Sequence, residues 1–474
     1  MADIAGWPHW EIQFDRIGNT AAGARAALLD QIAAAGLSDL IFMSHGWNSD
    51  IAHARRLYNQ WFGMLPPMLP GGSAAKPGTV GVFWPSMLWP DEPAPAAVAG
   101  GGAAGVPGPA AVSGTPGAPV AALAAVYPGP GQQQILSQLA ALLDAQSPDP
   151  QALTQFHDLM RALGGTEPET IGLEDSGQLA MLSEDPQALA ARFAAALDMA
   201  SAPAAGGGAA AGGSVTPDEG GAADLPDITL AGTGNGNGNG AGQGAAGGIG
   251  DITARLWGGA REALRQFTYW QMKQRAGTVG QQGLGPFLAD LAGRAPDLRV
   301  HLIGHSFGAR LVSFSLAGLP GGQPSPVRSV TLLEGAFSHF AFAPALPQDP
   351  ARSGALHGMM ARVAGPLLSC HSSHDMAIGI FYPVASMTAD DDASGLTDDL
   401  TFRWGGMGHD GAQAVNAAAQ TLGPQGSAYQ LAASKFTNID ASAVVCHGGP
   451  PSGAHSDIVH PELGWAMLTA AGLV

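Results

Sequence analysis

The chain has 474 residues and a formal net charge of −18, with 12% charged residues, 69 glycines and 36 prolines. The acidic surplus argues against a nucleic-acid partner, since phosphate binding needs clustered lysine and arginine. Two cysteines, Cys370 and Cys446, exclude a disulfide-built scaffold. The first residues lack a signal-peptide pattern, and no window is apolar enough to span a membrane. We therefore expect a cytoplasmic protein with no integral membrane segment.

Residues 1–90 have the pattern of the first part of a parallel α/β core. We predict strands over 10–14, 39–44 and 79–84, and helices over 20–35 and 51–64. The run 39–44, DLIFMS, is apolar almost throughout, as in a strand buried on both faces. A strand, a helix and a second strand in succession indicate parallel pairing.

The middle of the chain differs in composition. Residues 91–200 are an insertion rich in alanine, glycine and proline, with a possible helical cap formed by helices at 132–146, 151–163 and 187–200. Residues 201–250 are a glycine- and asparagine-rich linker with too few apolar groups to offset the entropy of ordering. We predict that this linker is disordered.

Residues 251–474 return to the α/β pattern and form the second part of the core. The predicted strands are 299–303, 328–333, 366–369 and 440–445, and the predicted helices are 255–275, 284–293, 309–319 and 461–473. Together the two parts predict one mostly parallel sheet flanked by helices and interrupted by the insertion.

A nucleophile elbow is predicted at Ser306. The sequence GHSFG, residues 304–308, stands between a buried strand and a long helix. This layout drives the serine into a strained backbone conformation and leaves no room for a Cβ at either glycine. A random chain of this glycine content would contain on average roughly half a match to the five-residue pattern. The prediction therefore depends on the flanking strand and helix.

The partners of such a serine are an acid and a histidine, each following a later strand in the order serine, acid, histidine. Asp375 and His455 meet this order and placement. Glu334, which ends the strand after the elbow helix, is the alternative acid. His447 and His460 are alternative bases.

Two backbone amides are expected to stabilise the negative oxygen of a tetrahedral intermediate. Phe307 directly follows the serine, and Trp47 lies in the loop HGW after the buried strand 39–44. Trp47, Trp84 and Met87 could line an apolar acyl pocket or simply pack in the core. We expect no metal and no cofactor, because His371 and His374 near Asp375 lack a second ligand cluster of suitable spacing. We expect both cysteines to be small buried residues.

Four segments resemble a bacterial α/β-hydrolase family of serine hydrolases: DLIFMSHGWNSD, RVHLIGHSFGARLV, SCHSSHDMAIGIFYP and GAHSDIVHPELGWAML. The resemblance covers about residues 36–90 and 251–474, and the nucleophile stretch is its most specific part. It implies an α/β-hydrolase fold with Ser306 as nucleophile, Asp375 as acid and His455 as base. It also implies that Trp47 and Phe307 are the oxyanion donors.

The sequence therefore predicts a carboxylesterase or lipase-like serine hydrolase acting on a small-molecule or lipid-like ester, with the insertion as a cap over the site. A serine peptidase or amidase with the same three residues is one alternative. A non-catalytic binding protein on a hydrolase scaffold is another. The residues leave the natural substrate and the oligomeric state open.

Overall fold

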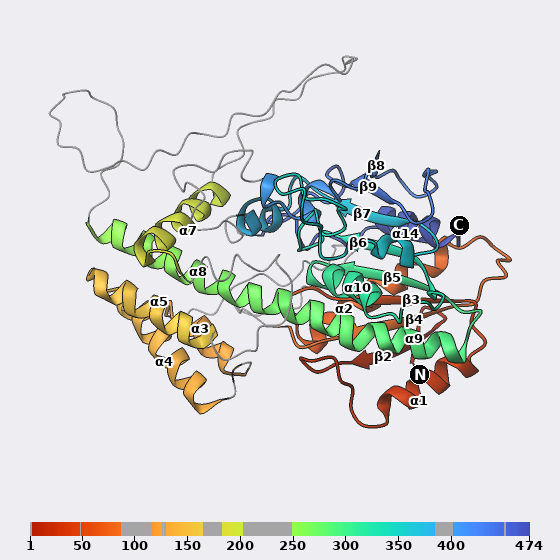
Figure 1. Ribbon diagram of the computed structural model, residues 1–474, viewed down its shortest axis with the longest axis horizontal. Helices are drawn as coiled ribbons and strands as arrows, with labels where there is room; N and C mark the ends of the chain where they lie inside the picture. Colours follow the sequence, from red (N-terminus) through yellow and green to blue (C-terminus); the bar gives the residue numbers. More distant parts are fainter. Residues whose placement is uncertain are drawn as a thin grey trace, which may run out of the picture.

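A computed structural model gives the fold of the chain (Figure 1). It describes residues 2–47, 49–86, 115–125, 127, 129–164, 183–201, 249–383, 402–449 and 452–474. The predicted linker 201–250 lies almost wholly outside these ranges, and so does Met87.

A nine-stranded sheet forms the centre of the molecule, with the strand order β1-β2-β4-β3-β5-β6-β7-β9-β8. β1 pairs with β2 antiparallel, and every other neighbouring pair is parallel. The strands are β1 (Ala2–Ile4), β2 (Trp7–Gln13), β3 (Asp39–Ser44), β4 (Pro77–Phe83), β5 (Arg299–His305), β6 (Val327–Leu333), β7 (Leu367–His371), β8 (Ala418–Thr421) and β9 (Phe436–Asp440). The predicted α/β class with a mostly parallel sheet is thus confirmed; the short edge strands β1 and β8 were not predicted.

Helices cover both faces of the sheet because side chains of the central strands alternate between two apolar cores. In β3, Phe42 packs into one core and Met43 into the other. The first core includes residues of α1 (Ala24–Ala34), α8 (Ile249–Thr278), the π-helical turn η4 (Val279–Leu284), α9 (Gly285–Arg294) and α10 (Phe307–Ala317). The second includes α2 (Ile51–Met64) and α14 (Pro461–Ala471). The two parts of the chain on either side of the insertion therefore share one sheet and its two layers.

The insertion contributes helices that lie beside the N-terminal half of α8, away from the sheet (Figure 1). They are α3 (Ala118–Ala122), α4 (Pro130–Ala145), α5 (Pro150–Gly164) and α7 (Pro186–Ser201). The Trp257 indole of α8 donates to the Ser147 carbonyl oxygen at 2.9 Å and meets the Phe156 ring edge-on. At Gly259 a Cβ would come within 1.9 Å of the Ala190 carbonyl oxygen, so α7 lies very close to α8. α8 thus joins the inserted helices to the core.

Two predictions from the sequence are wrong. The strand placed at 440–445 is β9, Phe436–Asp440, and the apolar run after it forms a turn in which Val444 and Val445 both donate to the Ala441 carbonyl oxygen. Val445 is buried there, which explains its apolar character without a strand. Cys370 is buried as expected, whereas Cys446 is exposed, and both are free thiols.

Within the described part of the chain, no helix combines the length and apolarity that crossing a bilayer requires.

Candidate active site

Ser306 occupies the sharp turn between β5 and α10. Its φ is 56° and its ψ is −123°, a conformation that side-chain-bearing residues rarely adopt. Its amide donates to the Leu333 carbonyl oxygen at 3.0 Å, which ties the turn to β6. A Cβ on Gly304 would lie 2.4 Å from the Gly308 carbonyl oxygen, and one on Gly308 would lie 2.1 Å from that of Ser44. The predicted strained turn and its two steric glycines are therefore present.

Ser306, His455 and Asp375 form a continuous hydrogen-bonded relay. The Ser306 Oγ lies 2.8 Å from His455 Nε2, and His455 Nδ1 lies 2.7 Å from Asp375 Oδ2. Asp375 is fully buried and the His455 side chain is 12% exposed. These three residues are far apart in the sequence, and the structure brings them together in the predicted order.

The loop that carries His455 is held against the loop that carries Asp375. The Ala454 amide donates to the His374 carbonyl oxygen at 2.9 Å, and Asp375 and Gly453 form an isolated antiparallel bridge. Gly453 has φ 61°, and a Cβ there would come within 2.4 Å of the His374 carbonyl oxygen. This close backbone contact fixes His455 relative to Asp375.

The alternative bases have another partner. His447 Nδ1 lies 3.2 Å and His460 Nε2 lies 2.8 Å from the Asp457 carboxylate. Burial would raise the pKa of Asp457, but hydrogen bonds from the His447 amide and the His460 side chain outweigh it and lower that pKa. Asp457 thus closes the loop around His455, and among the three histidines His455 is the one hydrogen-bonded to Ser306.

The alternative acid, Glu334, is a buried neighbour of Asp375. It directly follows β6, has φ 45° and is 1% exposed. Burial first, and then the neighbouring Asp375 charge, raise the pKa of Glu334 well above its ordinary value. The Asp375 carboxyl is the one that contacts His455 Nδ1, at 2.7 Å.

The loop after β3 lies directly against the serine. A Cβ on Gly46 would be 2.6 Å from the Ser306 Cβ and 3.2 Å from its Oγ, so the backbone beside Trp47 passes close to the Ser306 side chain. His45 anchors this loop: its ring stacks on Trp84 at 5.6 Å, and its carbonyl oxygen accepts from the Trp84 indole. Phe307 opens α10, where a first-turn amide has no intrahelical acceptor. Both predicted oxyanion residues therefore flank Ser306.

His305 is a further member of the site that the sequence reasoning missed. Its Nε2 lies 2.8 Å from the His455 carbonyl oxygen, and the two rings are 5.1 Å apart. Burial, and then the neighbouring His455, lower the pKa of His305 to about 3, so the ring is neutral and its Nε2–H is the donor. The signal in the sequence is the histidine directly before the serine in GHSFG.

Aromatic and charged side chains of helix α8 contact the two residues that flank Ser306, Trp47 and Phe307. The Tyr269 ring lies 4.4 Å from that of Phe307 and meets the Trp47 ring edge-on at 5.7 Å. The Arg265 guanidinium lies 5.6 Å from the Trp47 and Phe381 ring centres and pairs with Glu262. Of the predicted pocket residues, Trp47 contacts Tyr269 of α8, and Trp84 is buried in the core and stacked on His45. Met87 lies outside the described residues.

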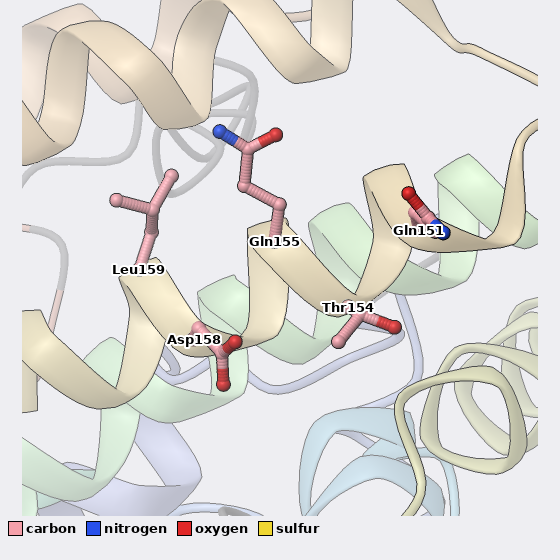
Figure 2. A pocket seen from close by; sticks show the side chains of 5 residues that line it. All are labelled: Gln151, Thr154, Gln155, Asp158 and Leu159. Atoms are coloured by element: carbon pink, nitrogen blue, oxygen red, sulfur yellow. The ribbon is translucent and has the colours of Figure 1, made fainter.

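A surface hollow elsewhere does not compete with this site. It lies on α5, where Gln155 and Leu159 point to the same side of the helix (Figure 2). The residues lining it are Gln151, Thr154, Gln155, Asp158 and Leu159. These side chains include no nucleophile paired with a base. In the described ranges, no three histidine, cysteine or acidic side chains are grouped so that they could hold a metal ion.

Comparison of the chain with protein-family models, with curated proteins and with solved structures finds no match.

Proposed function

We propose that the chain is a serine hydrolase with an α/β-hydrolase fold that cleaves carboxylic esters through an acyl-enzyme on Ser306. The observation that carries the proposal is the relay from Ser306 through His455 to Asp375, at 2.8 and 2.7 Å, on a strained strand-to-helix turn. A serine hydroxyl becomes a nucleophile when an oriented base removes its proton. The relay supplies that base and orients it.

In the first half-reaction, Ser306 Oγ attacks the ester carbonyl carbon while its proton passes to His455 Nε2. Asp375 accepts the His455 Nδ1–H and stabilises the imidazolium that forms. The negative oxygen is held by the Phe307 and Trp47 amides. Collapse of the intermediate breaks the bond to the alcohol oxygen, and His455 returns the proton to it.

In the second half-reaction, His455 takes a proton from water, and the hydroxide oxygen attacks the acyl carbon. The bond to Ser306 Oγ breaks, and the proton on His455 returns to that oxygen. The products are a carboxylic acid, an alcohol and the free enzyme. His305 supports both steps by binding the His455 carbonyl oxygen, so that the ring keeps its place between Ser306 and Asp375.

The aromatic rings of Trp47, Tyr269 and Phe307 favour an apolar group on the substrate. α8 contributes Tyr269 to the site and also packs against the inserted helices. The proposal therefore includes the predicted role of the insertion as a cap over the site. Deletion of residues 91–250 should change the preferred ester chain length; an unchanged profile would show that the insertion is not a lid.

The test is labelling with a fluorophosphonate probe. The parent chain should be labelled, whereas Ser306→Ala and His455→Ala should not; His447→Ala, which alters an exposed histidine of the same loop, is the matched control and should be labelled normally. Hydrolysis of aryl esters of increasing chain length should follow the same pattern. An unlabelled parent would disprove the proposal, and faster cleavage of peptide anilides than of esters would favour a peptidase or amidase.

A further inference from the structure

A second carboxyl group adjoins the proposed acid. Glu334 directly follows β6 and Asp375 follows the neighbouring strand β7, and the Glu334 amide donates to the Cys370 carbonyl oxygen at 3.1 Å. Both side chains are buried, with exposures of 1% and 0%. The ends of two adjacent parallel strands therefore place two carboxyl groups in one water-excluded space.

The two carboxyl groups have different partners. Asp375 Oδ1 accepts from the Ile378 amide at 3.0 Å and its Oδ2 contacts His455 Nδ1 at 2.7 Å, so both oxygens have hydrogen-bond partners. The Glu334 carboxyl is close enough to Asp375 for the charge of Asp375 to act on it, and its Oε2 receives no hydrogen bond from any donor in the described ranges. A buried carboxyl oxygen that accepts no hydrogen bond is expected when that oxygen is protonated.

Two buried carboxyl groups in contact do not both ionise, because the like charges repel and neither is solvated. Both oxygens of Asp375 already have hydrogen-bond partners, whereas Glu334 Oε2 has none in the described ranges. The groups facing Glu334 are the Asp375 carboxyl, the Cys370 thiol, the more distant Asp457 carboxyl and the Ser372 backbone, and only the last favours ionisation of Glu334. The proton of the pair therefore belongs on Glu334.

We propose that Glu334 is a positioning residue that, in its protonated form, donates a hydrogen bond to Asp375 and holds that carboxylate toward His455. The role rests on the proposed function, since it acts through Asp375 and touches no substrate. A neutral donor at this position fulfils the role, and a negative charge does not.

Two variants separate these possibilities. Glu334→Gln keeps a neutral hydrogen-bond donor and should retain kcat within about threefold, whereas Glu334→Leu has no donor and should lose about 10- to 100-fold in kcat with KM unchanged. The pH profile of kcat should keep its shape in Glu334→Gln. Both variants should be compared with the parent by ester hydrolysis and by the rate of fluorophosphonate labelling.

Infrared difference spectroscopy observes the proton directly, without activity. The parent minus Glu334→Gln spectrum at neutral pH should contain the carbonyl band of a protonated carboxylic acid. The matched control is Glu262→Gln, which removes a buried carboxylate paired with Arg265 and should give no such band.

Three results would overturn the inference: no protonated-acid band, a Glu334→Gln variant as slow as Glu334→Leu, or a Glu334→Leu variant as fast as the parent. These outcomes are distinct from failure of the proposed function. An unlabelled parent would sink the hydrolase and with it the positioning role. A labelled parent with a fast Glu334→Leu would sink the role of Glu334 alone.

Discussion

The structure contains two hydrogen-bonded relays of serine, histidine and aspartate. The first lies at the carboxyl end of β5, and the second lies inside the sheet, on β3, β5 and β6. In the second, His301 Nδ1 lies 2.8 Å from Ser329 Oγ, and His301 Nε2 lies 3.0 Å from Asp39 Oδ1. These distances resemble the 2.8 and 2.7 Å of the relay at Ser306. By hydrogen-bond geometry alone, either set of residues could be read as a catalytic triad.

The surroundings separate the two relays. Ser329 is a regular residue of β6, whereas Ser306 has φ 56° on a sharp turn ahead of a helix. His301 and Asp39 are completely buried, whereas the His455 side chain keeps 12% exposure. The Gly46 backbone passes close to Ser306, whereas no glycine in the described ranges has Ser329 among the nearest neighbours of its Cβ position. Substrate access, a strained turn and nearby amides therefore distinguish a candidate active site from a buried polar network that joins three strands.

The largest expected difference in kcat between the two relays comes from replacing their aspartates, Asp375 and Asp39. Asp375→Asn should lower kcat about 10³- to 10⁴-fold, because the amide favours the wrong tautomer of His455 and does not stabilise its charged form. Asp39→Asn should leave kcat per folded molecule within about twofold and should instead lower the free energy of unfolding. Ester hydrolysis and urea unfolding measured on both variants test this contrast, and a large kcat loss in Asp39→Asn would contradict it.

The effect of Asp39→Asn should depend on pH. Burial would raise the pKa of Asp39, but hydrogen bonds from His301, Arg299 and Ser38 outweigh it and lower that pKa below its ordinary 3.8. The ionised carboxylate therefore contributes stability that is present above the unfolded-state pKa and is lost as the pH falls through the folded-state pKa. The stability gap between parent and variant should be largest near pH 6 and should shrink below about pH 4.

A smaller loss should follow from crowding the loop after β3. In Gly46→Ala the new Cβ would lie 2.6 Å from the Ser306 Cβ, which displaces either the nucleophile or the adjacent Trp47 amide. We expect kcat to fall about 10²-fold, comparable to loss of one oxyanion donor, while the relay at Ser329 is unaffected. Steady-state kinetics on esters provide the measurement.

Gly63→Ala is the matched control, because a Cβ on this glycine of α2 has no neighbour within 4 Å. It should leave kcat unchanged and should not lower stability, since alanine is the better helix former. A Gly46→Ala enzyme with parental kcat would show that the loop does not take part in catalysis.

Replacement of His305 should lower kcat by a still smaller factor. His305→Phe keeps a ring but removes the N–H that binds the His455 carbonyl oxygen, and a hydrogen bond of this kind corresponds to about a 2- to 12-fold change. We expect kcat to fall within that range with KM unchanged, because the substrate is not contacted. His305→Gln, which retains an N–H donor, should recover part of the loss; an equal loss in both variants would assign His305 to packing alone.

The sequence predicted the relay at Ser306 because its members follow strand ends, and parallel strands bring their ends to one edge. The positions of individual strands and helices also follow from local patterns, as the agreement over 39–44 and 51–64 shows. The strand at 440–445 was misplaced because the turn contains the partly buried Val444 and the buried Val445, which have the same apolar signature as a strand.

Local sequence patterns could not predict the contacts of Glu334, His305 and His301. Glu334 meets Asp375 because β6 and β7 are neighbours with a defined register, and His305 meets the His455 backbone because a distant loop folds over it. The buried relay depends on the register of β3, β5 and β6 together. Such contacts are set by the alignment of strands, which short sequence windows do not specify.

The smallest expected effect on catalysis comes from Ser329→Ala, the same chemical change as Ser306→Ala made in the buried relay. Loss of this hydroxyl leaves His301 Nδ1 without its 2.8 Å partner in a fully buried position, which costs about 1–3 kcal/mol of stability. The kcat of the folded protein should not change, because neither the strained turn nor the loop at Gly46 is touched. Thermal unfolding together with ester hydrolysis tests both statements. A kcat loss in a folded Ser329→Ala variant would mean that the two relays are coupled through β5 and β6, and that hydrogen bonding within the sheet, besides the geometry of the turn, sets the reactivity of Ser306.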